Sequence, residues 1–200
     1  MHPLAYFPES MFPPQNRDTY LQKVYYGYDE AQHSSCCIVG CCRNIESSLS
    51  QVIFRLEALG KLFRTYHVFI YENNSTDQTK QWLFSPPGFT IIKEDLIDYQ
   101  SHDQDKSLIR RQNMARCRNK CLDFALKMNY KWTIVADLDT HGWSYEGVLN
   151  SLGHNKLAIG SNGILYREIN EKHERLYYDT WAYRKDSWDE EDATNQFITF

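Results

Sequence analysis

The stretch from Trp132 to Trp143 constrains the fold of this 200-residue chain more than any other. Its first four residues are aromatic or β-branched, and they run unbroken into Ala136. Such a run is typical of a strand buried on both faces, as in parallel sheets that carry helices on both sides. The stretch therefore predicts a central strand of an α/β sheet.

Asp137 and Asp139 come directly after this predicted strand, and Gly142 then turns the chain. Ligands of α/β proteins bind beyond the carboxyl ends of the strands, so the pair lies where a ligand would be. Mg²⁺ takes one or two protein carboxylates together with substrate phosphates, and Mn²⁺ accepts the same oxygen ligands. The pair thus predicts a divalent-metal site facing phosphate. The alternative is that both aspartates only cap a turn, where Asp is common.

Composition and charge narrow the class of protein. With 42% hydrophobic residues the chain can bury a full core, and its length corresponds to one domain of about 100–200 residues. The formal net charge of -4 gives no general attraction to nucleic acid or to an anionic membrane, so local charge must hold any anionic ligand. There is no apolar run of 18 residues and no charged and apolar leader, so we expect neither a membrane span nor a secretory signal.

The rest of the chain alternates predicted strands and helices. Residues 1–35 contain four of the six prolines and many aromatic residues, and we interpret them as an N-terminal arm packed on the domain. Apolar runs bounded by polar loops indicate strands, and apolar residues three and four apart indicate helices. In chain order the predicted elements are strand 36–42, helix 45–63, strand 67–71, a helix from about 77, strand 89–93, helix 107–128, strand 132–136, helix 144–151 and strand 157–164.

Six cysteines are present, without a Cys-x-x-Cys pair or a mixed cysteine and histidine ligand set. Four of them lie in the apolar run CCIVGCC, and Cys117 and Cys121 share one face of a predicted helix. Free cysteine in such positions behaves as a small buried hydrophobe. We therefore expect reduced, buried thiols and a reducing compartment, the cytoplasm.

Polar residues follow the first two predicted strands. Arg43 and Asn44 end the first, and Glu72 and Asp77 belong to the polar loop after the second. At the carboxyl edge of a sheet these side chains could bind the base and ribose of a nucleotide. The loop after the second strand is also rich in capping residues, so Asp77 could simply begin a helix. The two roles can coexist.

The predicted helix 107–128 carries a cluster of basic residues near its start. Arg111 and Arg118 lie seven apart and share one side of the helix with Asn119, while Arg110 and Arg116 are close by. The planar guanidinium group of arginine donates paired hydrogen bonds that suit a pyrophosphate. The alternative is a solvated basic face paired with neighbouring aspartates.

A late segment, YYDTWAYR at residues 177–184, places Asp179 among aromatic side chains. Flat rings around a carboxylate are suited to a sugar platform made by Tyr178, Trp181 and Tyr183. A buried aromatic cluster is the alternative.

This order of elements and motifs resembles the GT-A class of nucleotide-sugar glycosyltransferases. YENNSTDQT, the Ala115-Arg116-x-Arg118-Asn119 signature, ADLDTHG and YYDTWAYR resemble the family that includes fungal capsule mannosyltransferases, and the capsid-glycosylating glycosyltransferases of large algal viruses. The likeness covers about residues 36–184. It implies a single GT-A-like (Rossmann-like) catalytic domain over residues 36–200, with a mixed, mostly parallel sheet flanked by helices. Such a chain is short for these enzymes and could be one domain of a longer protein.

The resemblance also implies a reaction and a set of site residues. The donor would be a nucleoside-diphosphate sugar, with UDP favoured over GDP, and Mn²⁺ or Mg²⁺ would join its pyrophosphate to Asp139, with Asp137 facing the ribose or a metal-bound water. The acceptor would be a hydroxyl of a glycan or glycoprotein, and in a viral enzyme the compartment would be the host cytoplasm. The implied donor contacts are Arg43, Asn44, Glu72, Asp77, Arg111, Arg116, Arg118 and Asp137.

For an inverting reaction, Asp179 is the predicted base that takes the proton of the acceptor hydroxyl. Two other functions are open at this point. One is a nucleotide- or carbohydrate-binding module without transfer activity. The other is a sugar nucleotidyltransferase, which is disfavoured because the first strand ends in Cys-Cys-Arg-Asn rather than in a glycine-rich phosphate loop with lysine.

Overall fold

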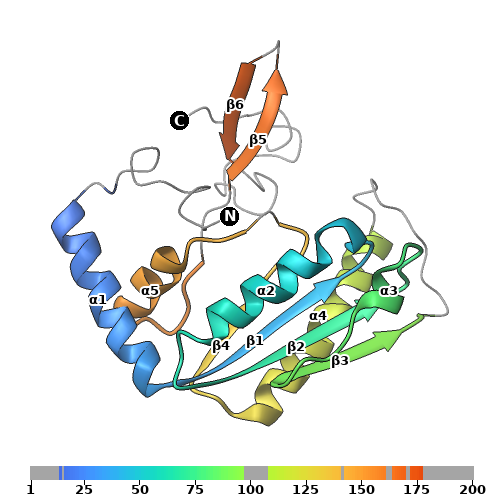
Figure 1. The fold of residues 1–200 in the computed structure, drawn as a ribbon, viewed down its shortest axis with the longest axis horizontal. Helices are drawn as coiled ribbons and strands as arrows, with labels where there is room; N and C mark the ends of the chain where they lie inside the picture. Colours follow the sequence, from blue (N-terminus) through green and yellow to red (C-terminus); the bar gives the residue numbers. More distant parts are fainter. Residues whose placement is uncertain are drawn as a thin grey trace. The chain divides into compact units, whose positions relative to one another are not determined.

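The structure is a computed structural model, and it describes residues 14, 16–96, 108–140, 142–160, 164–169 and 172–177. The chain divides into two compact units, residues 1–155 and 156–200. In the second unit, β5 (Ile164–Ile169) and β6 (Lys172–Tyr177) form an antiparallel hairpin. The first unit contains α1 (Arg17–His33), β1 (Ser35–Cys42), the short 3₁₀ helix η2 (Glu46–Ser48), α2 (Leu49–Gly60), β2 (Thr65–Asn73), α3 (Thr79–Trp82), β3 (Phe89–Glu94), α4 (Leu108–Met128), β4 (Trp132–Val135) and α5 (Tyr145–Gly153) (Figure 1).

The four strands of the first unit form one parallel sheet in the order β3-β2-β1-β4. β1 pairs with β2 along its whole length, from Ser35 opposite Thr65 to Cys42 opposite Glu72. On its other side, β1 pairs with β4 over residues 36–39. The chain therefore winds outward from β1 to β3 and then returns to the opposite side of β1. The predicted Rossmann-like α/β fold, with a mostly parallel sheet flanked by helices, is confirmed.

Two hydrophobic cores lie on the two faces of the sheet, and β1 supplies both. Cys36 and Ile38 belong to the core under α2, α1 and α5, whereas Cys37 and Val39 belong to the core under α4. This division follows from the strand itself, because successive side chains point to opposite faces. Figure 1 shows α2 and α4 on opposite sides of the strands. All six cysteines are free thiols; five of them are buried, as predicted, and Cys41 is partly exposed.

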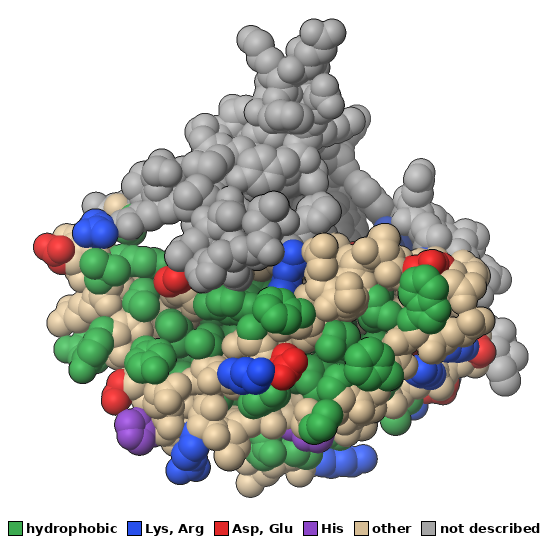
Figure 2. Space-filling model, in the orientation of Figure 1, with side chains coloured by type: hydrophobic (Ala, Val, Ile, Leu, Met, Phe, Trp, Pro, Cys, Tyr) green, Lys and Arg blue, Asp and Glu red, His purple; other side chains and the backbone are tan. Residues whose placement is uncertain are grey.

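Some large hydrophobic side chains stay exposed on the helices. Phe54 of α2, Trp82 of α3 and Phe84 after α3 are each more than half exposed. Figure 2 shows hydrophobic side chains mixed with polar ones on the face that carries α2. None of the helices that the structure describes combines the length and the apolar character that a membrane span needs.

The prediction that residues 132–136 form a central strand is wrong. In the described part of the chain, β4 pairs only with β1 and forms an edge of the sheet. Trp132 and Ile134 pack against the core under α2, but Thr133 is exposed and Val135 is 67% exposed. The cause is the position of α4, which packs on β1 and β2 and leaves this face of β4 uncovered. The strand predicted over residues 157–164 is likewise not formed at 157–160, where Leu157 is fully exposed.

α1 and α5 cross with their backbones in close contact. A Cβ atom on Gly27 would lie 1.7 Å from the carbonyl oxygen of Leu149, and one on Gly153 would lie 1.9 Å from that of Lys23. Only glycine allows two helices to approach so closely. α1 itself begins with a side-chain cap, because Asn16 Oδ1 accepts a hydrogen bond of 2.9 Å from the Thr19 amide.

Gly27→Ala tests this crossing. We expect the added methyl group to push the helices apart and to lower the free energy of unfolding by about 1–3 kcal/mol, measured by urea denaturation. Gly147→Ala on α5 is the matched control, because its Cβ atom would make only ordinary contacts, 3.4 Å from Ser144 Cβ at the closest. Equal stability of the two variants would contradict the close crossing.

Glu30 ties α1 to the start of β4. Its Oε1 atom accepts hydrogen bonds from Trp132 Nε1 at 2.8 Å, from Lys131 Nζ at 2.7 Å and from the Ser34 hydroxyl. Burial raises the pKa of this carboxyl, but the three side-chain donors together outweigh burial and lower the pKa to about 2. The charged form of Glu30 is therefore stabilised by folding.

Glu30→Gln should destabilise the protein in a pH-dependent way. A carboxyl whose pKa is lowered in the folded state stabilises the fold above its ordinary pKa of 4.5, and this contribution is lost as the pH falls towards 2. We expect a loss of about 1 kcal/mol at pH 7 that shrinks steadily below pH 4.5, measured by denaturation across this range. A loss that stays constant with pH would contradict this role.

Candidate functional site

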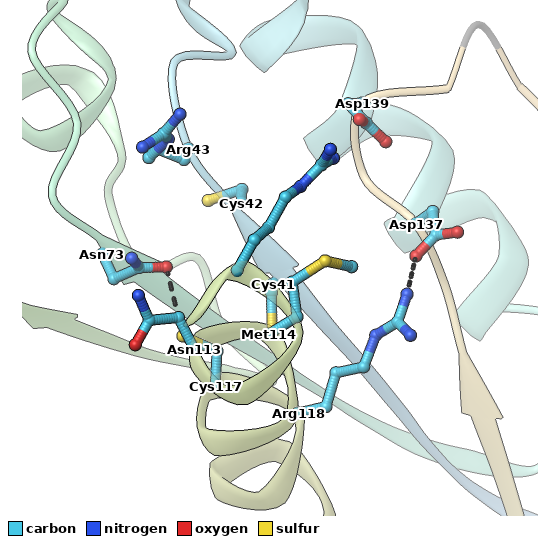
Figure 3. Close-up of a pocket in the computed structure, with 11 residues that line it drawn as sticks. Cys41, Cys42, Arg43, Asn73, Asn113, Met114, Cys117, Arg118, Asp137 and Asp139 are labelled. Atoms are coloured by element: carbon cyan, nitrogen blue, oxygen red, sulfur yellow. Dashed lines mark hydrogen bonds and ion pairs between the residues drawn. The ribbon is translucent and has the colours of Figure 1, made fainter. Parts of the chain in front are cut away.

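A pocket of about 260 Å³ opens where β1, β2 and β4 end beside the first half of α4 (Figure 3). The chain leaves β1 towards β2 on one side and returns to β4 on the other, so this is the point where the winding of the sheet reverses. Open α/β sheets bind ligands at such a point. The pocket is lined by Cys41, Cys42, Arg43, Asn73, Arg110, Asn113, Met114, Cys117, Arg118, Asp137 and Asp139.

Leu138 anchors the Asp-x-Asp pair. Its side chain is 1% exposed and packs in the core beside Gly40, where a Cβ atom would lie 2.7 Å from Leu138 Cγ. With Leu138 held inward, the flanking Asp137 and Asp139 are both exposed at the pocket. The segment is also a turn, because the Thr140 hydroxyl donates a 3.0 Å hydrogen bond to the carbonyl oxygen of Asp137. The turn and the ligand site are therefore compatible.

Arg118 reaches from α4 towards the first aspartate. Its Nη2 atom lies 3.3 Å from Asp137 Oδ1, as the dashed line in Figure 3 shows. Both side chains are more than half exposed, so this ion pair contributes little to stability and a ligand can readily replace it. Among the described residues, no side chain pairs with the Asp139 carboxylate.

The carboxylates fit a metal that arrives together with phosphate. In the part of the chain that the structure describes, no three His, Cys, Asp or Glu residues come together to hold a metal ion. Asp137 and Asp139 alone would leave most coordination positions open. That is the usual state of Mg²⁺ sites, in which one or two carboxylates and the substrate phosphates share the ion with water.

The basic residues of α4 that line the pocket differ from those predicted. Arg118 lines it, but so does Arg110, whereas Arg111 and Arg116 do not. The pocket side of α4 follows residues 110, 113, 114, 117 and 118, which recur at helical spacings of three and four, as in 110, 113 and 117 or 110, 114 and 118. Arg116 instead lies close enough to Glu94, at the end of β3, to help lower the pKa of that carboxyl, which the Tyr71 hydroxyl lowers most.

Asn44 braces the loops that follow β1 and β2. It has a φ angle of 52°, a backbone conformation that asparagine tolerates better than most residues. Its Oδ1 atom accepts a 2.8 Å hydrogen bond from the Thr76 backbone amide, and the backbone amide of Asn44 donates to Ser75 Oγ at 3.1 Å. Arg43 lines the pocket next to it, but Asn44 does not.

Asp77 continues this brace. Oδ1 accepts from the Thr79 amide at 2.9 Å, at the start of α3, and Oδ2 accepts from the Glu46 amide at 3.1 Å. Burial raises the pKa of this carboxyl. Hydrogen bonds from the Thr79 side chain and from the Thr79 and Glu46 amides lower the pKa by more than burial raises it, so it lies below its usual range. Asp77 therefore satisfies the amide of the first residue of α3, although the N-cap position itself is Gln78, and Asp77 does not line the pocket.

Glu72 is fully buried at the end of β2 and also lies outside the lining. Its Oε1 atom accepts from the Ser75 amide at 2.9 Å, whereas Oε2 is buried without a hydrogen-bond partner among the described residues. The nucleoside contacts proposed for Asn44, Glu72 and Asp77 thus stay predictions.

The sequence interpretation missed two amides of the pocket. Asn73 is 5% exposed at the end of β2, and its Oδ1 atom accepts a weak hydrogen bond from Cys117 Sγ at 3.5 Å. Asn113 lies one helical turn before Cys117 and has a buried Nδ2 atom. Helical spacing back from Cys117, four positions away, would have found Asn113, but no sequence pattern singles out an asparagine as a ligand.

Neutral thiols line the same part of the pocket. Cys41 Sγ lies 3.5 Å from Cys121 Sγ, and this contact together with burial raises the pKa of Cys41. Burial also raises the pKa of Cys117 to about 11. Burial likewise raises the pKa of Cys42, the third thiol of the lining, so all three are protonated at neutral pH and offer no thiolate to a metal.

Asp179, Tyr178, Trp181 and Tyr183 lie outside the described residues, so their predicted catalytic and acceptor-binding roles are not addressed by the structure.

Asp77→Asn distinguishes a brace from a ligand contact. Replacing Oδ2 by an amide group should repel the Glu46 amide and lower the free energy of unfolding by about 1–2 kcal/mol, measured by denaturation at pH 7. Because the pKa of Asp77 is lowered, this loss should be complete above the ordinary carboxyl pKa and fade on acidification. Asp123→Asn, an exposed change on α4, is the control and should stay within about 0.5 kcal/mol of the unchanged protein.

Comparison with known proteins gives one match. A model of the Anp1 family matches residues 43–199, which is more than half of the chain and includes every residue of the pocket lining except Cys41 and Cys42. No curated protein and no solved structure matches the chain.

Proposed function

The chain belongs to the Anp1 family of mannosyltransferase-like glycosyltransferases, and we propose that it moves a sugar from a nucleoside-diphosphate sugar to a hydroxyl of a glycan or glycoprotein. The observation that carries this proposal is the pocket at the reversal point of the sheet. There, two exposed carboxylates after β4 face the basic side of α4. The mannosyltransferase-like character of the family favours mannose as the transferred sugar.

The charges of the pocket suit a diphosphate. Arg43, Arg110 and Arg118 line it in a chain whose formal net charge is -4, so the positive charge is local. Guanidinium groups bind phosphate oxygens through paired, charge-assisted hydrogen bonds. Asp137 and Asp139 would repel the same oxygens unless a cation stood between them. The combination therefore favours a diphosphate that binds with a divalent metal.

The reaction would break the bond between the anomeric carbon of the sugar and the diphosphate oxygen. The diphosphate leaves with the bonding electrons while the acceptor oxygen forms the new bond to that carbon. Negative charge then grows on the diphosphate, where Arg110 and Arg118 would bind it more strongly than in the ground state. When bound by Asp137 and Asp139, Mn²⁺ or Mg²⁺ would supply Lewis-acid stabilisation of the same charge.

The proton of the acceptor hydroxyl also needs a destination. In an inverting reaction a carboxylate takes it directly, and Asp179 is the residue we propose for this role. Its support is its place in the sequence, among the aromatic residues Tyr178, Trp181 and Tyr183 that would hold the acceptor sugar.

Calorimetric titration of UDP and GDP, with and without Mn²⁺, tests the donor site. We expect one nucleotide to bind in a metal-dependent way, with the metal dependence lost in Asp139→Ala and affinity lowered about tenfold in Arg118→Ala. Asp123→Ala and Arg111→Ala make the same charge changes on α4 outside the pocket lining, and they should have smaller effects.

Two outcomes would change the proposal. If neither nucleotide binds, the glycosyltransferase pocket is refuted for this chain. If a nucleotide binds but its sugar donor is neither transferred nor hydrolysed in the presence of Mn²⁺, a binding module without transfer activity is favoured instead.

A further inference from the structure

Asn113 holds an unused hydrogen-bond donor in the pocket. Its Nδ2 atom is buried and has no partner among the described residues. A buried donor without a partner costs free energy, because the group has lost water and gained nothing in return. A ligand that places an acceptor atom next to Nδ2 would remove this cost. The position of Asn113 therefore points to a specific contact with whatever fills the pocket.

Asn113 has neutral polar neighbours in Asn73, Cys41 and Cys117, although Arg110 also lines the pocket one helical turn before it. Asn73 accepts the hydrogen bond from Cys117 and donates from Nδ2 to Asn74 Oδ1 at 3.3 Å. Cys41 and Cys117 are protonated thiols, because the contact with Cys121 and burial raise the pKa of the first and burial raises that of the second. This part of the pocket offers amides and thiols, and it comes from β2, the end of β1 and α4.

The two carboxylates lie on the other side of the same pocket. Figure 3 shows Asn73 and Asn113 on one side, below Arg43, and Arg118, Asp137 and Asp139 on the other. A nucleoside diphosphate that binds with a metal would place the metal and its diphosphate beside the two aspartates. Its neutral base and ribose would then lie beside the amides.

We propose that Asn113 is a specificity-determining residue that donates a hydrogen bond from Nδ2 to a carbonyl or hydroxyl oxygen of the nucleoside. This inference rests on the proposed function, since it assumes that the pocket binds a nucleoside diphosphate. It assigns the side of the pocket that carries the two amides to the nucleoside and the side that carries the two aspartates to the diphosphate. Recognition of the nucleoside then depends on a residue of α4 rather than only on the loops after β1 and β2.

The test compares two probes in the presence of Mn²⁺, the nucleoside diphosphate that binds best and inorganic pyrophosphate, by calorimetry. Asn113→Ala should weaken the nucleotide about tenfold and leave pyrophosphate unchanged, because only the nucleotide carries the acceptor. Asn113→Asp keeps the size of the side chain but removes the donor, and it should weaken the nucleotide at least as much. Arg118→Ala should weaken both probes.

Gln112→Ala is the matched control, because it removes a neighbouring exposed amide of α4 that does not line the pocket. It should bind both probes like the unchanged protein, and circular dichroism should show that all variants are folded.

Three results would overturn the inference, and they are distinguishable. If Asn113→Ala binds the nucleotide normally while Arg118→Ala does not, the proposed function stands and the role of Asn113 is wrong. If Asn113→Ala weakens pyrophosphate as much as the nucleotide, the amide contacts phosphate. If the unchanged protein binds no nucleotide, the proposed function fails together with the inference.

Discussion

Burial of β1 on both faces is the constraint on which the rest of the structure depends. Its residues feed two separate cores in alternation, with Cys36 and Ile38 on one side and Cys37 and Val39 on the other. β1 also pairs with strands on both edges. Small and β-branched side chains make this possible, because helices must approach the strand from both directions. With β1 in place, α2 covers one face of the sheet and α4 covers the other. The loop after Cys42 then lies beside the ends of β2 and β4.

The site follows from that arrangement more than from any one motif. Parallel strands end at the same edge of the sheet, so segments far apart in the sequence meet there without further design. Buried Leu138 then holds the two aspartates outward, and helical spacing brings Arg110, Asn113 and Arg118 to the same opening. The loop after β2 contributes to stability rather than to the pocket, since the hydrogen bonds of Asn44 and Asp77 join it to the loop after β1.

Sequence patterns reported the type of the elements between residues 36 and 151 well, because periodicity reflects the chain's own geometry, but they missed α1. They failed where the answer depends on a neighbour. Val135 is as apolar as a buried residue, yet nothing in its own sequence reveals that α4 stops short of β4. The basic cluster on α4 was recognised, but a shift of one residue in the helix face replaced Arg111 by Arg110. Asn73 and Asn113 were missed because an amide becomes informative only when its burial and partners are known.

The close crossing of α1 and α5 affects how the boundary of this domain should be drawn. The family match starts at residue 43, one position after β1 ends. A polypeptide cut at that point would lack the shared partner of β2 and β4, and α5 would lose the helix against which Gly153 packs. The matched segment is therefore shorter than the folding unit, to which residues 16–42 also belong.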